Sequence, residues 1–174
     1  MRSPRIFYGG AIQGAINREE RSHVHQFIIE TIKSQGYEVV TEYTTGRTYE
    51  EAMEKLEQAI GSLPPRGLQR RIYVRNKMIE AIEGDIVAAI FEVSVPSLGT
   101  GIEIAHAYLR PRMSLPTIPV LCLYQKNYWS NQLSTMIQGI TTEAVPHFTL
   151  VVYEKLDEIP LILNKFLIDN LGTC

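Results

Sequence analysis

The sequence predicts an α/β protein in which five parallel strands form one sheet with helices on both faces. Short, apolar, β-prone runs alternate along the 174 residues with longer segments whose apolar residues recur at helical spacing. The helical segments begin at capping motifs and end at glycine or proline. Strands joined through helices are parallel and bind ligands at their carboxyl ends. These features together are typical of a Rossmann-like, flavodoxin-like fold.

Length and composition indicate the number of domains and the kind of ligand that we expect. With 45% hydrophobic residues, the chain fits a single domain spanning residues 1–174. A net charge of −2 and an isoelectric point near 6.1 give no general basic field, so binding to a nucleic acid polymer is not expected. A small anionic ligand stays compatible with this charge.

Cysteine content and hydropathy indicate the compartment. Cys122 lies in an apolar run and Cys174 at the end of the sequence, which is not a disulfide framework. We find no targeting signal before the first strand-like run, and no apolar stretch near the roughly 18 residues that cross a bilayer. The sequence therefore predicts a soluble, cytoplasmic protein without membrane contact.

The first predicted strand, residues 5–8, runs into the pair Gly9-Gly10 and so into a tight turn. Ala11 occupies the place of the middle glycine of a dinucleotide fingerprint, and no acidic partner follows where one is expected, so this function is disfavoured. Asn17-x-x-Glu20 predicts the start of a helix that ends at Gly36, and residues 37–40 predict the second strand.

Two helices come next. Thr48-x-x-Glu51 predicts the first, which residues 61–65 end, and the spacing of apolar residues predicts the second over residues 68–83. Cations on the second helix are typical of a solvated face, and the alternative is a wall that contacts phosphate. These cations are Arg66, Arg70, Arg71, Arg75 and Lys77.

The central strand, residues 86–91, leads into Pro96-Ser-Leu-Gly-Thr-Gly-Ile-Glu103, where we expect a helix to open with Glu103 in its first turn. Small residues at Ser97, Gly99 and Gly101 would let a ligand approach the backbone, and free N–H groups at a helix start favour an anion. Alternatively, Thr100-x-x-Glu103 is a capping box in which Glu103 only bonds to its own helix start. Both interpretations stay open.

The rest of the chain completes the alternation. The helix of Glu103 should stop near residues 110–111, and His106 within it is more typical of a packed histidine than of a catalytic one. Strands are predicted over residues 117–124 and 148–153, with a short helix over residues 133–139 between them. Ile159, Ile162, Leu163 and Phe166 predict a final packing helix.

Three segments resemble a known family. Pro96 to Glu103, together with Leu121-Cys-Leu and Leu133-Ser-Thr-Met-Ile-Gln-Gly139, is similar to the 2'-deoxynucleoside 5'-phosphate N-hydrolases, which are relatives of the nucleoside 2-deoxyribosyltransferases. The resemblance implies that Glu103 attacks the anomeric carbon, while Ser97 and the backbone of Gly99 hold the 5'-phosphate. It also implies a homodimer in which Ser134 reaches the phosphate of the neighbouring subunit. Further substrate-binding residues implied are Phe7, Tyr8, Gly10, Ile12, Gly101 and Met136.

The sequence departs from the family at three places. Phe7 stands where the family has a tyrosine, with Tyr8 facing the other side of the strand, and Ala11 and Gln13 replace a serine and an arginine. The Phe7 arrangement resembles cytidine 5'-monophosphate N-glycosidases, so we expect ribonucleotides to be accepted at least as well as 2'-deoxy forms. A catalytic aspartate is matched only by Asn76, which cannot accept a proton. Glu80, one turn later, is the alternative.

The chemistry implied is a retaining glycoside reaction, in which a carboxylate forms a covalent intermediate that water resolves. We expect the helix start to keep Glu103 ionised and either Glu80 or solvent to supply a proton to the base. No metal or cofactor is expected, since no cluster of residues has the spacing of metal ligands. The rivals are a transferase, which the phosphate-binding Ser97 and Ser134 disfavour, and a non-enzymatic nucleotide-binding module.

Overall fold

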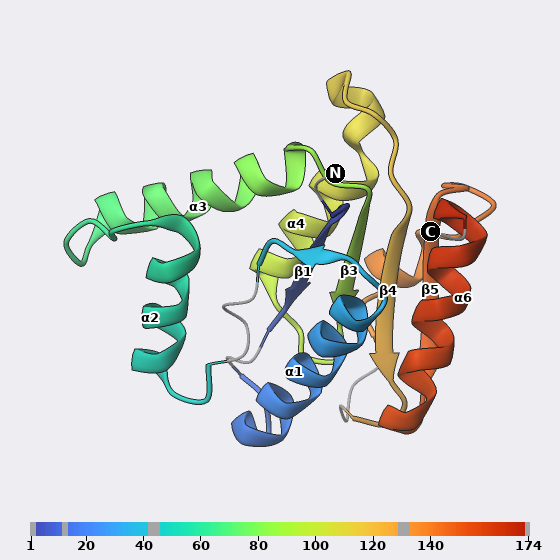
Figure 1. Ribbon diagram of the computed structural model, residues 1–174, viewed down its shortest axis with the longest axis horizontal. Helices are drawn as coiled ribbons and strands as arrows, with labels where there is room; N and C mark the ends of the chain where they lie inside the picture. Colours follow the sequence, from blue (N-terminus) through green and yellow to red (C-terminus); the bar gives the residue numbers. More distant parts are fainter. Residues whose placement is uncertain (1–2, 12–13, 42–45, 129–132, 173–174) are drawn as a thin grey trace.

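A five-stranded, all-parallel sheet with the strand order β2-β1-β3-β4-β5 forms the centre of the molecule (Figure 1). The computed structural model describes residues 3–11, 14–41, 46–128 and 133–172. The α/β fold class predicted from the sequence is confirmed. The strands are β1 (Arg5–Gly10), β2 (Glu38–Val39), β3 (Ala88–Glu92), β4 (Val120–Gln125) and β5 (Phe148–Tyr153).

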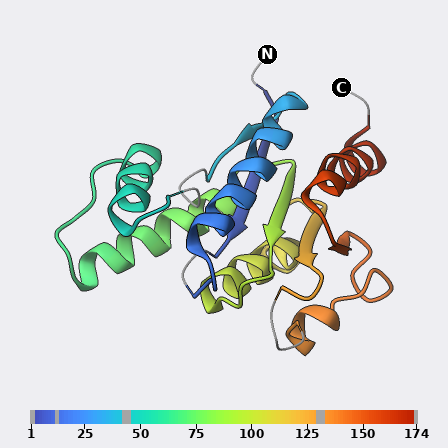
Figure 2. The same ribbon diagram turned by 90° about the horizontal axis from the view of Figure 1, so that it is seen from below.

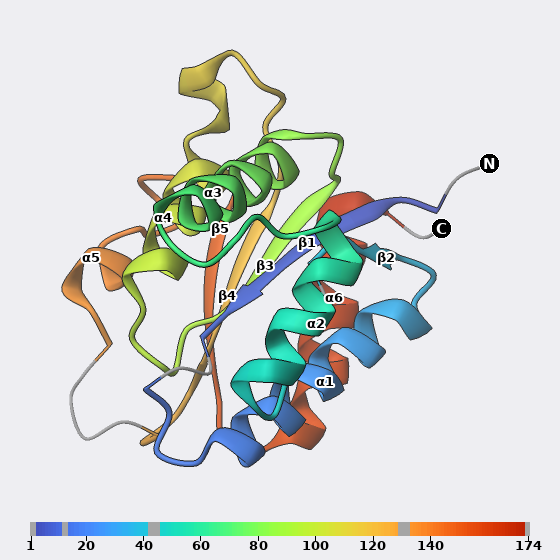
Figure 3. The same ribbon diagram turned by 90° about the vertical axis from the view of Figure 1, so that its left-hand side faces the viewer.

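Helices cover both faces of the sheet, as Figure 2 shows from the carboxyl ends of the strands. α1 and α6 pack on one face, and α4 packs on the other with α3 against it. Figure 3 shows α2 and α3 in front of the sheet, on the side where β1 and β2 lie, and α5 beside α4. The helices are α1 (Arg18–Ser34), α2 (Tyr49–Ile60), α3 (Leu68–Glu83), α4 (Leu98–Tyr108), α5 (Thr135–Gln138) and α6 (Ile159–Leu171). None of the helices within the described residues has the length and apolar character of a membrane span.

Alternation along β1 divides the core into two layers. Phe7 packs with Phe91 and Ile104 on the α4 face, whereas Tyr8 packs with Ile28 and Leu163 on the α1 and α6 face. This confirms that Phe7 and Tyr8 point to opposite sides of the strand.

Local capping explains where the first helices begin. The Asn17 side chain accepts the Glu20 N–H at 3.1 Å, and the Thr48 side chain accepts the Glu51 N–H at 3.1 Å. Gly36, just beyond α1, has a φ of 89°, a conformation that strongly favours glycine. The predicted starts of α1 and α2 are therefore confirmed.

Strand β4 begins three residues later than predicted, at Val120 instead of residue 117. Pro119 precedes it and has no N–H to donate to a sheet. Only the Pro119 carbonyl takes part, accepting the Ala89 N–H at 3.0 Å.

The strand order creates a switch point between β1 and β3. From β1 the chain crosses to β2 on one side, and from β3 it crosses to β4 on the other. Ligands of open parallel sheets bind in the crevice at such a point, outside the carboxyl ends of the strands. Here those ends bring Gly9 beside Phe91 and Gly10 beside Glu92.

Candidate active site

The Glu103 carboxylate lies at this switch point, against the end of β1. A Cβ atom built on Gly9 would lie 3.0 Å from Glu103 Oε2 and 2.7 Å from the Phe91 ring. A larger residue at position 9 would therefore displace either the carboxylate or the ring. The bare backbone of Gly9 lets the carboxylate approach the edge of the sheet.

The capping-box interpretation of Thr100 and Glu103 is wrong. Helix α4 begins at Leu98, and its N-cap is Ser97, whose Oγ accepts the Thr100 N–H at 3.2 Å. Thr100 is a helical residue, and Glu103 lies in the second turn instead of the expected first. The Glu103 carboxyl is therefore not needed to cap the helix.

Burial changes the acid–base behaviour of Glu103. The partly buried carboxyl loses hydration, which raises its pKa to about 7. We expected the helix start to hold this group ionised, and that expectation is wrong because the helix begins earlier and its dipole acts mainly within the first turn. Near neutral pH the group exchanges a proton readily and, once ionised, is a poorly solvated carboxylate.

The start of α4 offers a site for an anion. The N–H groups of Leu98 and Gly99 occupy the first two helical positions, where no intrahelical acceptor exists. Ser97 uses its oxygen as acceptor from Thr100, which leaves its O–H free to donate to an anion. Capping and phosphate binding by Ser97 are thus compatible.

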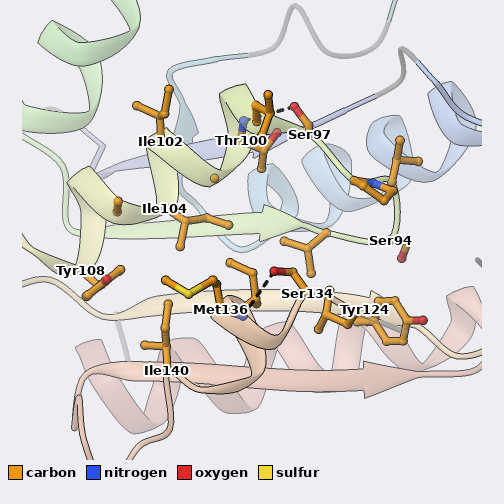
Figure 4. A pocket seen from close by; sticks show the side chains of 18 residues that line it. Ser94, Ser97, Thr100, Ile102, Ile104, Tyr108, Tyr124, Ser134, Met136 and Ile140 are labelled. Atoms are coloured by element: carbon orange, nitrogen blue, oxygen red, sulfur yellow. Dashed lines mark hydrogen bonds between the residues drawn. The ribbon is translucent and has the colours of Figure 1, made fainter. Parts of the chain in front are cut away.

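Ser97 and Ser134 line one groove of about 580 Å³ between α4 and α5 (Figure 4). Apolar side chains form most of its wall, among them Leu98, Ile102 and Met136, and Gly101 also lines it. Glu103 is not part of this wall, since it points from α4 toward β1. Ser134 Oγ accepts the Met136 N–H at 3.3 Å and so caps α5.

Two residues of the first strand, Phe7 and Tyr8, do not lie as expected for ligand contacts, whereas Gly10 is half-buried at the carboxyl end of β1. Phe7 is fully buried in β1, with its ring 5.8 Å from that of Phe91, so it does not face the ligand at the turn. Tyr8 is buried on the opposite face from Glu103, bonded through its hydroxyl to His25 Nδ1 at 2.5 Å. A Cβ on Gly10 would overlap His25 Cε1, so packing accounts for this glycine. Ile12 and Gln13 lie outside the described residues.

Asn76 and Glu80 are exposed on α3. The Asn76 side chain accepts from Arg75 Nη1 at 3.1 Å, and the Glu80 carboxylate pairs with Lys77 Nζ at 2.7 Å. His106 Nδ1 lies 2.8 Å from Glu83 Oε1, as expected of a packed histidine. Glu83 follows Glu80 by three residues and His106 follows Glu103 by three, so this contact ties the two helices together one turn beyond the candidate site.

Most of the cations on α3 are exposed to solvent or contact neighbouring residues of the α2–α3 hairpin. Arg71 and Arg75 are exposed, and the Arg70 side chain donates to the Pro64 carbonyl at 2.7 Å. Lys77 pairs with Glu80. These contacts belong to the α2–α3 hairpin itself.

Sequence reasoning missed a polar cluster on the α1 and α6 face of the sheet. Glu92, the last residue of β3, is fully buried there together with Arg21 of α1. The one signal for it was a glutamate inside the otherwise apolar run of residues 86–93. Buried charges are rare unless they are paired, so Glu92 required a partner.

The fold and this site define a Rossmann-like α/β protein with a carboxylate and the start of a helix at its switch point. No family model matches the chain. Curated relatives named "Putative 2'-deoxynucleoside 5'-phosphate N-hydrolase 1" do match it. The protein of Thermofilum pendens is 33% identical over 131 residues, covering 75% of this chain and 74% of its own.

Two further relatives with the same name extend the match. The Methanosarcina barkeri protein is 31% identical over 138 residues, or 79% of this chain and 70% of its own. The Nematostella vectensis protein is 29% identical over 163 residues, or 93% of each chain. The chain belongs to the 2'-deoxynucleoside 5'-phosphate N-hydrolase family, which confirms the resemblance seen in the sequence.

Proposed function

We propose that this protein hydrolyses the N-glycosidic bond of a nucleoside 5'-monophosphate, releasing the free base and a sugar 5-phosphate. The observation that supports this most is the Glu103 carboxylate, placed against Gly9 at the switch point, on the helix whose first N–H groups are suited to an anion. The names of the relatives support an N-hydrolase of the same class.

In the proposed mechanism, ionised Glu103 attacks C1' of the sugar. The bond between C1' and the base nitrogen breaks, and its electron pair leaves with the base, which takes up a proton. Water then attacks C1' and releases one proton to solvent or Glu80, the bond to Glu103 breaks, and the carboxylate is regenerated. Either solvent or Glu80 supplies the proton, and Asn76 orients a sugar hydroxyl.

The test of this function is base release from a panel of ribonucleoside and 2'-deoxynucleoside 5'-monophosphates, followed by chromatography. We expect free base and sugar 5-phosphate in equal amounts. The same panel gives the ratio of kcat/KM for each ribo/deoxy pair, which we propose to be one or more. Because Phe7 is buried in the core, that ratio reflects the whole pocket and not a contact of Phe7. Absence of base release from every member of the panel would contradict the proposed function.

We propose that Ser97 binds the 5'-phosphate of its own subunit. Ser97→Ala is expected to raise KM for nucleoside monophosphates about 10- to 100-fold, because a hydrogen bond to a charged group contributes about 1.5–3 kcal/mol. KM for the unphosphorylated nucleosides should stay unchanged. The matched control is Ser34→Ala, which removes an exposed hydroxyl at the end of α1. An equal rise in KM for both substrate types would contradict this assignment.

We propose that the protein forms a homodimer through the groove between α4 and α5. Leu98, Met136 and Ile102 are 91%, 81% and 55% exposed. A partner subunit would remove this apolar surface from water, which is energetically favourable. A second subunit covering this groove would bring its Ser134 toward the helix start of α4. Each phosphate site would then be completed by the neighbouring chain.

Mixed dimers test the shared site. In a 1:1 mixture of Ser134→Ala and Glu103→Gln chains, half the dimers are hybrids with one intact site, so we expect about a quarter of wild-type activity at low substrate concentration. Activity no greater than the mean of the two separate variants would mean that each subunit works alone.

A further inference from the structure

A buried polar cluster lies behind the proposed site, on the face of the sheet opposite Glu103. Its centre is the ion pair of Arg21 and Glu92, both fully buried, with Arg21 Nη1 3.4 Å from Glu92 Oε1. Ser94 Oγ and Tyr153 Oη also donate to Glu92 Oε1, the latter at 3.1 Å. We call Arg21, Glu92, Ser94, Gln125 and Tyr153 the Arg21–Glu92 cluster.

The cluster joins the ends of three strands to the first turn of α1. Arg21 Nη2 donates to Gln125 Oε1 at the end of β4, and the Arg21 guanidinium stacks 4.0 Å from the Tyr128 ring centre. The Gln125 N–H in turn donates to Ser94 Oγ at 2.7 Å. Ser94 is thus held from two sides, by Glu92 and by β4.

Ser94 occupies the connection between β3 and α4, and this connection carries the proposed site. Ser97, three residues later, caps α4, and Glu103 lies in the second turn of that helix. A displacement of Ser94 would therefore shift both the phosphate-binding helix start and the carboxylate relative to Gly9 of β1. Misplacement of reacting groups by about 1 Å can cost about 100-fold in rate.

We infer that Arg21 and Glu92 are positioning residues, which fix the connection from β3 to α4 and thereby the distance between Glu103, Ser97 and the substrate. This inference rests on the proposed function. Stability alone does not explain the pair, since a buried ion pair can often be replaced by uncharged side chains with no loss of stability. In addition, Glu92 Oε2 and Arg21 Nε have no hydrogen-bond partner among the described residues.

The test is the double variant Arg21→Met/Glu92→Gln. It removes both charges together, so no buried charge is left unpaired, and the amide introduced by Glu92→Gln keeps an oxygen for Tyr153 and Ser94. We expect a melting temperature close to that of the wild type, with kcat/KM for a nucleoside 5'-monophosphate about 10- to 100-fold lower. Both kcat and KM should change, because Glu103 and Ser97 shift together.

A second measurement does not depend on activity. Amide hydrogen exchange over residues 93–101 should be faster in the double variant, whereas exchange over α6 should not change. If wild-type protein releases no base, the proposed function fails, but this exchange measurement still tests the positioning role. Kinetics and exchange equal to those of the wild type would overturn the inference.

Two further variants complete the experiment. Ser94→Ala keeps both charges and removes the hydroxyl that joins Glu92 to β4 and that also lines the groove of Ser97 and Ser134. It serves if the double variant does not fold, and kcat/KM should fall about 10-fold. Lys165→Met/Asp169→Leu removes an exposed ion pair of α6 with a separation of 2.8 Å and should leave the kinetics unchanged. Wild-type kinetics in Ser94→Ala would likewise overturn the positioning role.

Discussion

Glu103→Gln is expected to abolish base release, with kcat lower by at least about 1,000-fold, because an amide cannot act as the nucleophile on C1'. Glutamine keeps the shape of the side chain and its fit against Gly9, so the fold should be retained. The measurement is free base formed per enzyme, by chromatography, at saturating nucleoside 5'-monophosphate.

The matched control is Glu83→Gln, which changes a glutamate on α3 that contacts His106 on α4. Its kcat should stay within about 10-fold of the wild-type value, because Glu83 lies one turn beyond the candidate site. Turnover by Glu103→Gln at the wild-type rate would remove Glu103 from the mechanism.

The same variant is expected to be more stable than the wild type at neutral and alkaline pH. The pKa of Glu103 is about 7 in the folded protein, above its unfolded value of 4.5. Between these values the unfolded chain loses the proton while the folded protein keeps it, so wild-type stability falls as the pH rises through this window. The maximum loss above pH 7 is about 3 kcal/mol.

Urea unfolding at pH 4 and pH 8 measures this effect. Glu103→Gln and wild type should differ little at pH 4, where the carboxyl is protonated in both states. At pH 8 the variant should be stabilised by up to about 3 kcal/mol. The kcat/KM of the wild type should rise with pH through about 7, as the nucleophile ionises. A variant less stable than the wild type at pH 8 would contradict the burial of an uncompensated carboxylate.

Much of the fold could be predicted because local signals agree with the tertiary structure. The side chains of Asn17 and Thr48 cap the helices that their spacing predicts. The limits of α3 and β5 also match the apolar pattern. Strand β4 begins later than predicted, since a pattern of apolar residues does not show that Pro119 lacks the N–H that a strand needs.

Features of the candidate site that depend on a local sequence motif were predictable, whereas features that depend on tertiary packing were not. Glu103 was found from its motif, but its second-turn position depends on which residue caps α4, and both Ser97 and Thr100 are suitable residue types. The raised pKa of Glu103 arises from tertiary burial, which local spacing does not contain. Likewise, alternation placed Phe7 on the correct face of β1 without showing that its ring is covered.

The Arg21–Glu92 cluster marks the clearest limit of sequence reasoning. The paired residues are 71 positions apart, and their meeting requires that α1 pack over the end of β3. A glutamate within an apolar run indicates that a buried partner exists. Which of the 17 lysines and arginines is that partner depends on the three-dimensional fold.

The most direct test of a covalent mechanism through Glu103 is the configuration of the product formed in buffer containing methanol. Methanol competes with water for the intermediate, and its glycoside does not interconvert between anomers as the free sugar does. Double displacement through Glu103 predicts the methyl glycoside 5-phosphate with the β configuration of the substrate, identified by NMR. The α anomer would show a single displacement by solvent and would contradict the role of Glu103 as nucleophile.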